Sequence, residues 1–341
     1  MNDSEIGGRI EELLRVSITG ARDVRAEEVE RVFGGNARRA WASTVRWTDQ
    51  SGARRSESVI MLSRTSGSQV DADPEWEFGV LSALEHSATR APRAFALDAD
   101  GSIVGAPSIL LERMPGRADP LAFLRSEDRE GGRKLTLDLA RAAAELHSAD
   151  WEEVGLGEIL ASGPPDRSPL TQIESWEAQF LTHRMEPHPA LAYAFAWLRA
   201  NLPEPARISV VHGDFRPGNF LYQSNTVVAL LDWEMAHLGD PVEDLAWAYR
   251  ALWSPERFVD LEEFVRSYEE FGGPKVTEHA LRFYRVFAEA KFATISLRAS
   301  RSFADGVSGN LRLADRAATV TASMKRCLAW IADSGKGSAW C

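Results

Sequence analysis

Short runs in which hydrophobic and polar residues alternate dominate the chain from about residue 27 to residue 113. Three of these runs, 29–35, 39–47 and 56–64, predict β-strands, with turn residues between the second and third. A helix is expected over 73–87, because Asp73 and Pro74 form a typical helix start before an apolar stripe. Further along, 92–98 and 107–114 are also strand candidates.

After residue 116 the hydrophobic period becomes helical, apart from a short strand region at 208–234. We expect helices over the following segments: 134–150, 171–185, 189–202, 241–252, 255–271, 277–301 and 310–332. A small sheet with one helix, followed by a large helical part, predicts an α+β fold with two lobes. The expected domains are residues 1–115, residues 116–333 and a tail, 334–341.

The composition is that of an ordinary globular protein, with 44% hydrophobic and 26% charged residues among 341. The formal net charge of −11 and the absence of a basic stripe argue against a nucleic-acid partner. Two cysteines without a CxxC pair provide neither a disulfide framework nor a zinc site. The first residues lack a signal-peptide pattern, and no apolar run reaches 18 residues. We therefore expect a cytoplasmic protein with no membrane partner, as a monomer or a homodimer.

Lysine is rare in this sequence. Five of the 39 basic residues are lysines, and none precedes Lys134. This excludes a P-loop of the GxxxxGK[ST] kind and any lysine chemistry in the first 133 residues.

The densest polar grouping lies in residues 208–250. A buried strand at 208–211 leads into a loop that contains Asp214, and Asn219 precedes the next strand. The hairpin partner of that strand ends at Asp232, so we expect Asn219 and Asp232 at neighbouring positions. Carboxylate and amide oxygens of this kind suit Mg²⁺, which usually binds one or two carboxylates together with water and phosphate.

The spacing of this grouping is similar to the H-R-D-x-x-x-x-N loop of protein kinases, with Gly213 in place of the arginine. The chain resembles the aminoglycoside phosphotransferase and choline kinase-like family, whose fold is similar to that of protein kinases. HGDFRPGN and LLDWEMAHLGDPVEDLAW carry most of the resemblance, which extends from about residue 32 to residue 332. The stretch 145–156 is also similar to the branch of the family that is associated with acyl-CoA dehydrogenases.

The resemblance implies a kinase that uses ATP and Mg²⁺ and phosphorylates a hydroxyl of a small molecule. Asp214 would be the catalytic carboxylate, and Arg216 would lie near the γ-phosphate. Asn219 and Asp232 would hold Mg²⁺. Asp244 would anchor the loop backbone, unless it is a solvated helix carboxylate.

In the amino-terminal lobe, Gly34, Gly35 and Asn36 resemble the loop that covers the nucleotide. Glu77 matches the family's helix glutamate, and Arg64 is the leading candidate for its cationic partner, with Arg38 or Arg39 as substitutes. Because Arg64 comes one residue after the usual place, Ser63 occupies the position of the family's arginine.

Three other features complete the prediction. Backbone groups from Glu112 to Met114 would bind adenine, if this segment is not simply an edge strand. Glu243 is read as a capping-box residue with a structural role, and His212 as a support of the catalytic loop, while Glu234 is left unassigned. Aromatic residues that could line an acceptor site, although helical spacing is more typical of core, are Trp151, Trp176, Phe180 and Trp247.

Three functions remain open. The first is the Mg·ATP-dependent phosphotransferase, with a small metabolite such as a hydroxyacyl thioester favoured over an aminoglycoside as the acceptor. The second is a nucleotide-binding module with little activity, suggested by Ser63. The third is a metal-dependent phosphatase or hydrolase that uses the same carboxylates.

Overall fold

The chain forms two compact units in the computed structural model, which describes residues 3–32, 38–64, 74–160, 164 and 167–333. One unit comprises Met1–Gly116 together with Val228–Glu234, and the other comprises Arg117–Val227 together with Met235–Cys341. The seven residues 228–234 return to the first unit, so the units are not two consecutive pieces of the chain.

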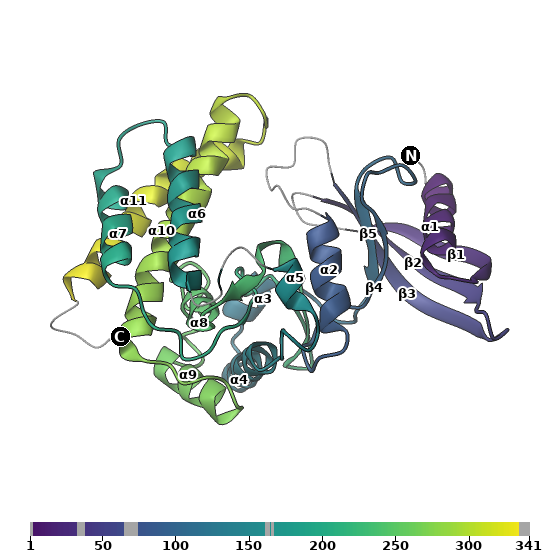
Figure 1. The fold of residues 1–341 in the computed structure, drawn as a ribbon, viewed down its shortest axis with the longest axis horizontal. Helices are drawn as coiled ribbons and strands as arrows, with labels where there is room; N and C mark the ends of the chain where they lie inside the picture. Colours follow the sequence, from purple (N-terminus) through teal and green to yellow (C-terminus); the bar gives the residue numbers. More distant parts are fainter. Residues whose placement is uncertain (1–2, 33–37, 65–73, 161–163, 165–166, 334–341) are drawn as a thin grey trace. The chain divides into compact units, whose positions relative to one another are not determined.

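An antiparallel five-stranded sheet in the order β1-β2-β3-β5-β4 forms the first unit (Figure 1). Its strands are β1 (Arg22–Val32), β2 (Arg38–Thr48), β3 (Arg54–Arg64), β4 (Ala94–Asp98) and β5 (Ser108–Glu112). The strands expected from the alternating pattern are present, and β1 begins earlier than expected. Helix α2 (Pro74–Leu84) lies beside β4 and β5, as Figure 1 shows, and buries Val80, Leu81 and Leu84.

A helix that the sequence analysis did not predict, α1 (Asp3–Ser17), packs on the opposite edge strand, β1. Its residues Ile6, Ile10 and Leu13 are fully buried in the core of the first unit. On β3, Val59 and Met61 point into the same core. The spacing of the buried positions along α1 is that of a single helix face, so the pattern was present in the sequence.

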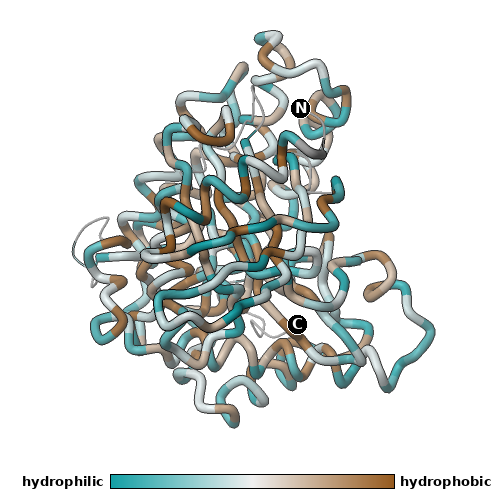
Figure 2. The backbone as a smooth tube through the Cα atoms, turned by 90° about the vertical axis from the view of Figure 1, so that its right-hand side faces the viewer, coloured by the Kyte–Doolittle hydropathy of each residue, from teal (hydrophilic) through white to brown (hydrophobic). Residues whose placement is uncertain are grey.

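The second unit is mostly helical. Its helices are α3 (Pro120–Leu124), α4 (Arg129–His147), α5 (Leu156–Ile159), α6 (Ser168–His183), α7 (Pro189–Ala200), α8 (Val242–Ala248), α9 (Leu261–Glu270), α10 (Glu278–Ala304) and α11 (Leu311–Ala332). Helix α10 packs against α6, α7, α8 and α11. Along the backbone in Figure 2, hydrophobic and hydrophilic residues are interspersed.

Short strands carry the residues of the polar grouping. Strand β6 (Ser209–Val211) pairs antiparallel with β9 (His237–Gly239), which the sequence analysis did not predict. Strand β7 (Phe220–Gln223) forms a hairpin with β8 (Thr226–Leu230). The loop 212–219 therefore runs between the ends of β6 and β7.

Across the part of the chain that the structure describes, no helix has both the length and the apolar character that crossing a bilayer requires.

Replacing Ile10 by alanine should lower the free energy of unfolding of the first unit by about 2–5 kcal/mol, because Ile10 is fully buried beneath the sheet. Val16 lies on the same helix but is 66% exposed, so V16A should change stability by no more than about 0.5 kcal/mol. Urea unfolding followed by hydrogen exchange of the β1 and β2 amides measures both variants. Equal stability of I10A and V16A would contradict this packing of α1.

Candidate active site

The side chain of Asp214 is held by three hydrogen bonds within the second unit. Oδ1 accepts from Arg216 Nε at 2.8 Å and from Trp247 Nε1 at 2.7 Å. Oδ2 accepts from Asn219 Nδ2 at 2.5 Å. A carboxylate has about four lone-pair positions, so these bonds fix the group and leave one position for a further donor. The structure thus brings together three of the predicted site residues, Asp214, Arg216 and Asn219.

The backbone of this loop is anchored by Asp244, from the first turn of α8. The fully buried carboxylate accepts from His212 N–H at 2.7 Å and from Gly213 N–H at 2.9 Å. It also contacts His147 Nε2 at 3.1 Å, and His147 Nδ1 lies 2.9 Å from the Tyr268 hydroxyl. The geometry is that of a backbone anchor, and the alternative of a solvated helix carboxylate is wrong.

Lys291, in the middle of α10, binds the carbonyl group of Gly213, the residue whose N–H is bound by Asp244. Its ammonium group is 1% exposed, donates to Gly213 O at 2.6 Å and pairs with Glu243 Oε1 at 2.8 Å. The ring of Trp247 lies 4.8 Å from the ammonium nitrogen, a cation–π distance. Gly213 has φ +79°, and a Cβ there would lie 2.3 Å from Met235 O, so this position requires glycine.

The capping-box role expected for Glu243 is wrong. Its carboxylate is buried between Lys291 and His237, whose Nε2 lies 3.3 Å from Glu243 Oε2. Asp240 Oδ1, by contrast, accepts from Val242 N–H at 3.0 Å at the start of α8. The sequence contained one signal for the pair: Lys291 is a rare lysine that stands directly between Ala290 and Phe292.

The charges around Glu243 shift its titration strongly. Burial alone would raise the pKa of Glu243, but the charges of Lys291 and His237 outweigh it and lower the pKa to about 2. Conversely, burial lowers the pKa of His237, and the carboxylate of Glu243 raises it above its ordinary value. Both shifts stabilise an ionised cluster beside the loop.

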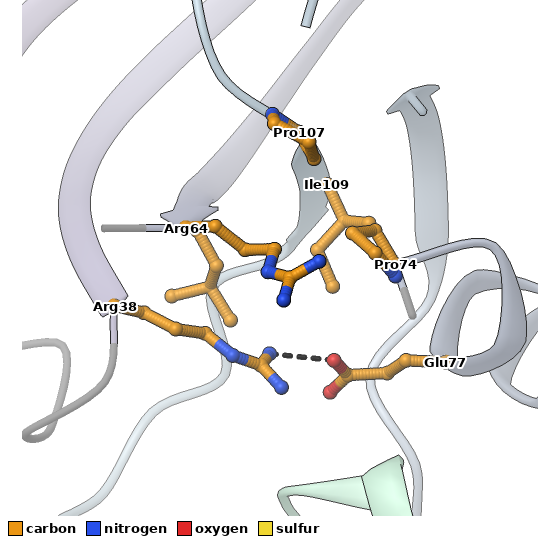
Figure 3. A pocket seen from close by; sticks show the side chains of 7 residues that line it. Arg38, Arg64, Pro74, Glu77, Pro107 and Ile109 are labelled. Atoms are coloured by element: carbon orange, nitrogen blue, oxygen red, sulfur yellow. Dashed lines mark hydrogen bonds and ion pairs between the residues drawn. The ribbon is translucent and has the colours of Figure 1, made fainter. Parts of the chain in front are cut away.

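In the first unit, Arg38 forms the centre of a second charged cluster, shown in part in Figure 3. Its Nη1 donates to Glu77 Oε2 at 2.5 Å, while Nη2 lies 3.2 Å from Glu234 Oε2 and 3.7 Å from Asp232 Oδ1. Burial would lower the pKa of Arg38, but the three carboxylates raise it above its ordinary value. Burial and the charge of Asp232 raise the pKa of Glu234 to about 7.

The partner of Glu77 in this cluster differs from the leading candidate, Arg64. Arg38 and Arg64 are directly opposite one another in the register of β2 and β3. Together with Leu62 and Glu77, both line a small pocket (Figure 3). Ser63 is 4% exposed and points to the other face of the sheet, because side chains alternate along a strand.

The outcome differs among the other predicted residues. Glu112 ends β5, and its side chain accepts from Arg93 Nε at 3.2 Å. Within the described residues, no hydrogen bond involves the backbone of Met114. Gly34, Gly35 and Asn36 lie outside the described residues. Asp232 belongs to the first unit and Asn219 to the second, so their expected proximity stays a prediction.

Most of the aromatic candidates for an acceptor site are core residues. Trp176 is 8% exposed, and Phe180 stacks on Phe195 with ring centroids 5.8 Å apart. Trp247 is also buried, but its indole N–H reaches Asp214. Helical spacing therefore indicated packing in this unit, with Trp247 serving the site as well.

Replacing Lys291 by methionine should lower the free energy of unfolding by about 3–5 kcal/mol, because Glu243 would then be buried without its cation. The double variant K291M/E243M removes both charges and should recover much of the loss. K325M changes an exposed lysine and serves as the control. Urea unfolding measures all three, and a K291M variant as stable as K325M would contradict the proposed contribution of the pair.

Glu243 should also make the free energy of unfolding depend on pH in the acid range. Since its pKa is lowered in the folded state, its contribution is present above its ordinary pKa of 4.5 and is lost as the pH falls towards 2. E243Q, which cannot titrate, should show a flatter stability profile between these pH values. E262Q, at an exposed position, should keep the wild-type slope in urea unfolding at stepwise lower pH. Parallel profiles for wild type and E243Q would disprove this assignment.

Comparison with known proteins places this geometry in a family. Residues 38–284 match the model of the phosphotransferase enzyme family. Acyl-CoA dehydrogenase family member 10 of Mus musculus is 32% identical over 211 residues, which cover 60% of this chain and 19% of the relative. Probable acyl-CoA dehydrogenase IBR3 of Arabidopsis thaliana is 29% identical over 251 residues, covering 64% and 30%. The chain therefore spans less than a third of the length of these relatives.

Solved structures share the fold. A putative aminoglycoside phosphotransferase from Ralstonia eutropha JMP134 superposes with a TM-score of 0.75 at 22% identity, covering 96% of this chain and 98% of that one. A thermostable mutant of aminoglycoside phosphotransferase APH(4)-Ia, solved with ADP and hygromycin B, gives a TM-score of 0.57 at 16% identity, covering 92% and 96%. These likenesses confirm the predicted α+β, protein kinase-like fold class. The chain belongs to the phosphotransferase enzyme family.

Proposed function

We propose that this protein is a small-molecule kinase that transfers the γ-phosphoryl group of Mg·ATP to a hydroxyl group, with Asp214 as the catalytic base. One observation carries the proposal. The Asp214 carboxylate is fixed by Arg216, Trp247 and Asn219, on a loop whose backbone is anchored by a buried aspartate. Phosphoryl transfer depends mainly on such positioning and on neutralising charge.

The chemistry assigned to the loop is simple. The free lone-pair position of Asp214 accepts a hydrogen bond from the acceptor hydroxyl and orients its oxygen for attack on the γ-phosphorus. As the new O–P bond forms, the bond to the bridging oxygen of ADP breaks, and the hydroxyl proton passes to Asp214. Arg216 is held through Nε, with Nη1 3.4 Å from Pro217 O, and its guanidinium group is assigned to the γ-phosphate.

The proposed ligands of Mg²⁺ are Asn219 and Asp232. Asn219 donates through Nδ2 to both Asp214 O and Asp214 Oδ2, so its amide oxygen is left as a possible ligand. The Asp232 side chain is 41% exposed and follows β8 with φ +71°, an uncommon conformation that aspartate tolerates. Within the described part of the chain, no three His, Cys, Asp or Glu side chains form a metal site. This agrees with an ion that takes few protein ligands and, when bound, neutralises phosphate charge.

The nucleotide is assigned to the pocket of the first unit and its surroundings. Arg64 and Arg38 line this pocket, Glu77 is the ionic partner of Arg38, and the backbone of Glu112 to Met114 would bind adenine. The loop at Gly34, Gly35 and Asn36 is proposed to cover the phosphates. A nucleotide-binding module with little activity is the alternative, since Ser63 replaces the family's cation on β3.

The proposed acceptor is a small hydroxylated metabolite. The curated relatives bear the names of acyl-CoA dehydrogenases, and this favours a hydroxyacyl thioester as the acceptor. The solved structures named as aminoglycoside and macrolide phosphotransferases support an antibiotic acceptor instead. A cytoplasmic location and a monomer or homodimer, without a nucleic-acid or membrane partner, complete the proposal. A screen of hydroxyacyl thioesters, aminoglycosides and macrolides for ADP release separates the acceptors.

Replacing Asp214 by asparagine should lower phosphoryl transfer by about 10²–10⁴-fold, because the variant keeps the shape but cannot take the proton. ATP binding should remain, as measured by thermal shift with and without Mg²⁺. D305N, at an exposed position near the end of α10, is the matched control and should keep full activity. Unchanged ADP release in D214N would eliminate Asp214 as the base.

A further inference from the structure

We infer that the guanidinium group that the helix glutamate positions for the nucleotide phosphates comes from β2, through Arg38, and not from β3. This inference rests on the proposed function, because it concerns the ATP that the protein would use. It gives Arg38, which the sequence offered only as a substitute for Arg64, a specific role in binding phosphate.

The ion pair itself is the first argument. Glu77 is 3% exposed and Arg38 12% exposed, and their atoms meet at 2.5 Å (Figure 3). A carboxylate buried to this degree needs a cation beside it, and it holds that cation in one orientation. Glu77 therefore fixes Arg38 at the wall of the pocket.

The strand geometry is the second argument. Ser63, in the place of the family's arginine on β3, faces the core occupied by Val59 and Met61 and cannot reach the pocket. Arg64 does line the pocket, but at the last position of β3. Arg38 is directly opposite it at the first position of β2. The cation that pairs with Glu77 is therefore on β2, directly opposite the position of Arg64 on β3.

The position of the second Nη group is the third argument. Arg38 Nη2 points away from Glu77 towards Glu234 and Asp232, at 3.2 Å and 3.7 Å. Asp232 is the carboxylate proposed to hold Mg²⁺, and the metal in such sites binds the phosphates. Arg38 thus lies between Glu77 and Asp232. Phosphate oxygens can replace the carboxylates of Glu234 and Asp232 as partners of its Nη2 group.

The test compares affinities for adenosine, ADP and Mg·ATP by isothermal titration calorimetry. In R38M, the preference for ATP over adenosine should fall by about ten- to hundredfold, while adenosine affinity is unchanged. A merely structural role of Arg38 would weaken adenosine binding equally. In R64M, the preference for ATP over adenosine should fall by less than about threefold. R39M, at the exposed neighbouring position, should lose none.

A double variant distinguishes loss of ATP binding from misfolding. R38M leaves Glu77 buried without its cation, whereas R38M/E77M removes both charges and should fold while showing the same loss of ATP preference. An equal or greater loss in R64M, or an unchanged preference in both Arg38 variants, overturns the inference alone. Failure of the wild-type chain to bind ATP overturns the proposed function together with the inference.

Discussion

The buried carboxylate of Asp244 is the contact on which the catalytic loop depends. It accepts two consecutive backbone N–H groups, from His212 and Gly213, and so sets the path of the chain just before Asp214. Without this acceptor, two backbone N–H groups would be buried away from water without a hydrogen-bond partner, which is costly in free energy. Its own orientation is fixed by His147, so the loop is connected to the core of α4 and α9.

Lys291 completes this arrangement from the opposite side. Gly213 donates its N–H to Asp244 and offers its carbonyl oxygen to Lys291, so the two peptide groups that flank this residue are held by a carboxylate and an ammonium group. Charged partners strengthen both hydrogen bonds. Because α8 supplies Asp244 and Glu243 while α10 supplies Lys291, the packing of these two helices determines where the Asp214 carboxylate lies.

The local pattern of hydrophobic and polar residues was sufficient to predict most of the helices and strands and the polar loop, because each is encoded by neighbouring residues. Alternation identified β2 and β3, and helical spacing identified α4 and α10. The three-residue strand β9 was not predicted, since its pairing with β6 is specified by tertiary structure. Glu243 was misread for a related reason. Its position three residues after Asp240 fits a capping box, but the decisive partner, Lys291, is 48 residues away. Likewise, the spacing along β3 could not reveal that the ion pair of Glu77 is made from β2.

The chemistry of arginine explains how a first unit without lysine can maintain this cluster. A lysine offers a single nitrogen, so a buried glutamate and a phosphate would compete for the same charge. The planar fork of Arg38 separates these tasks, with Nη1 directed to Glu77 and Nη2 towards the carboxylates at the end of β8. A guanidinium on β2 approaches Glu77 from a different strand than a cation on β3 would, and its greater length bridges that distance. In this arrangement a forked cation stands where a lysine would supply a point charge.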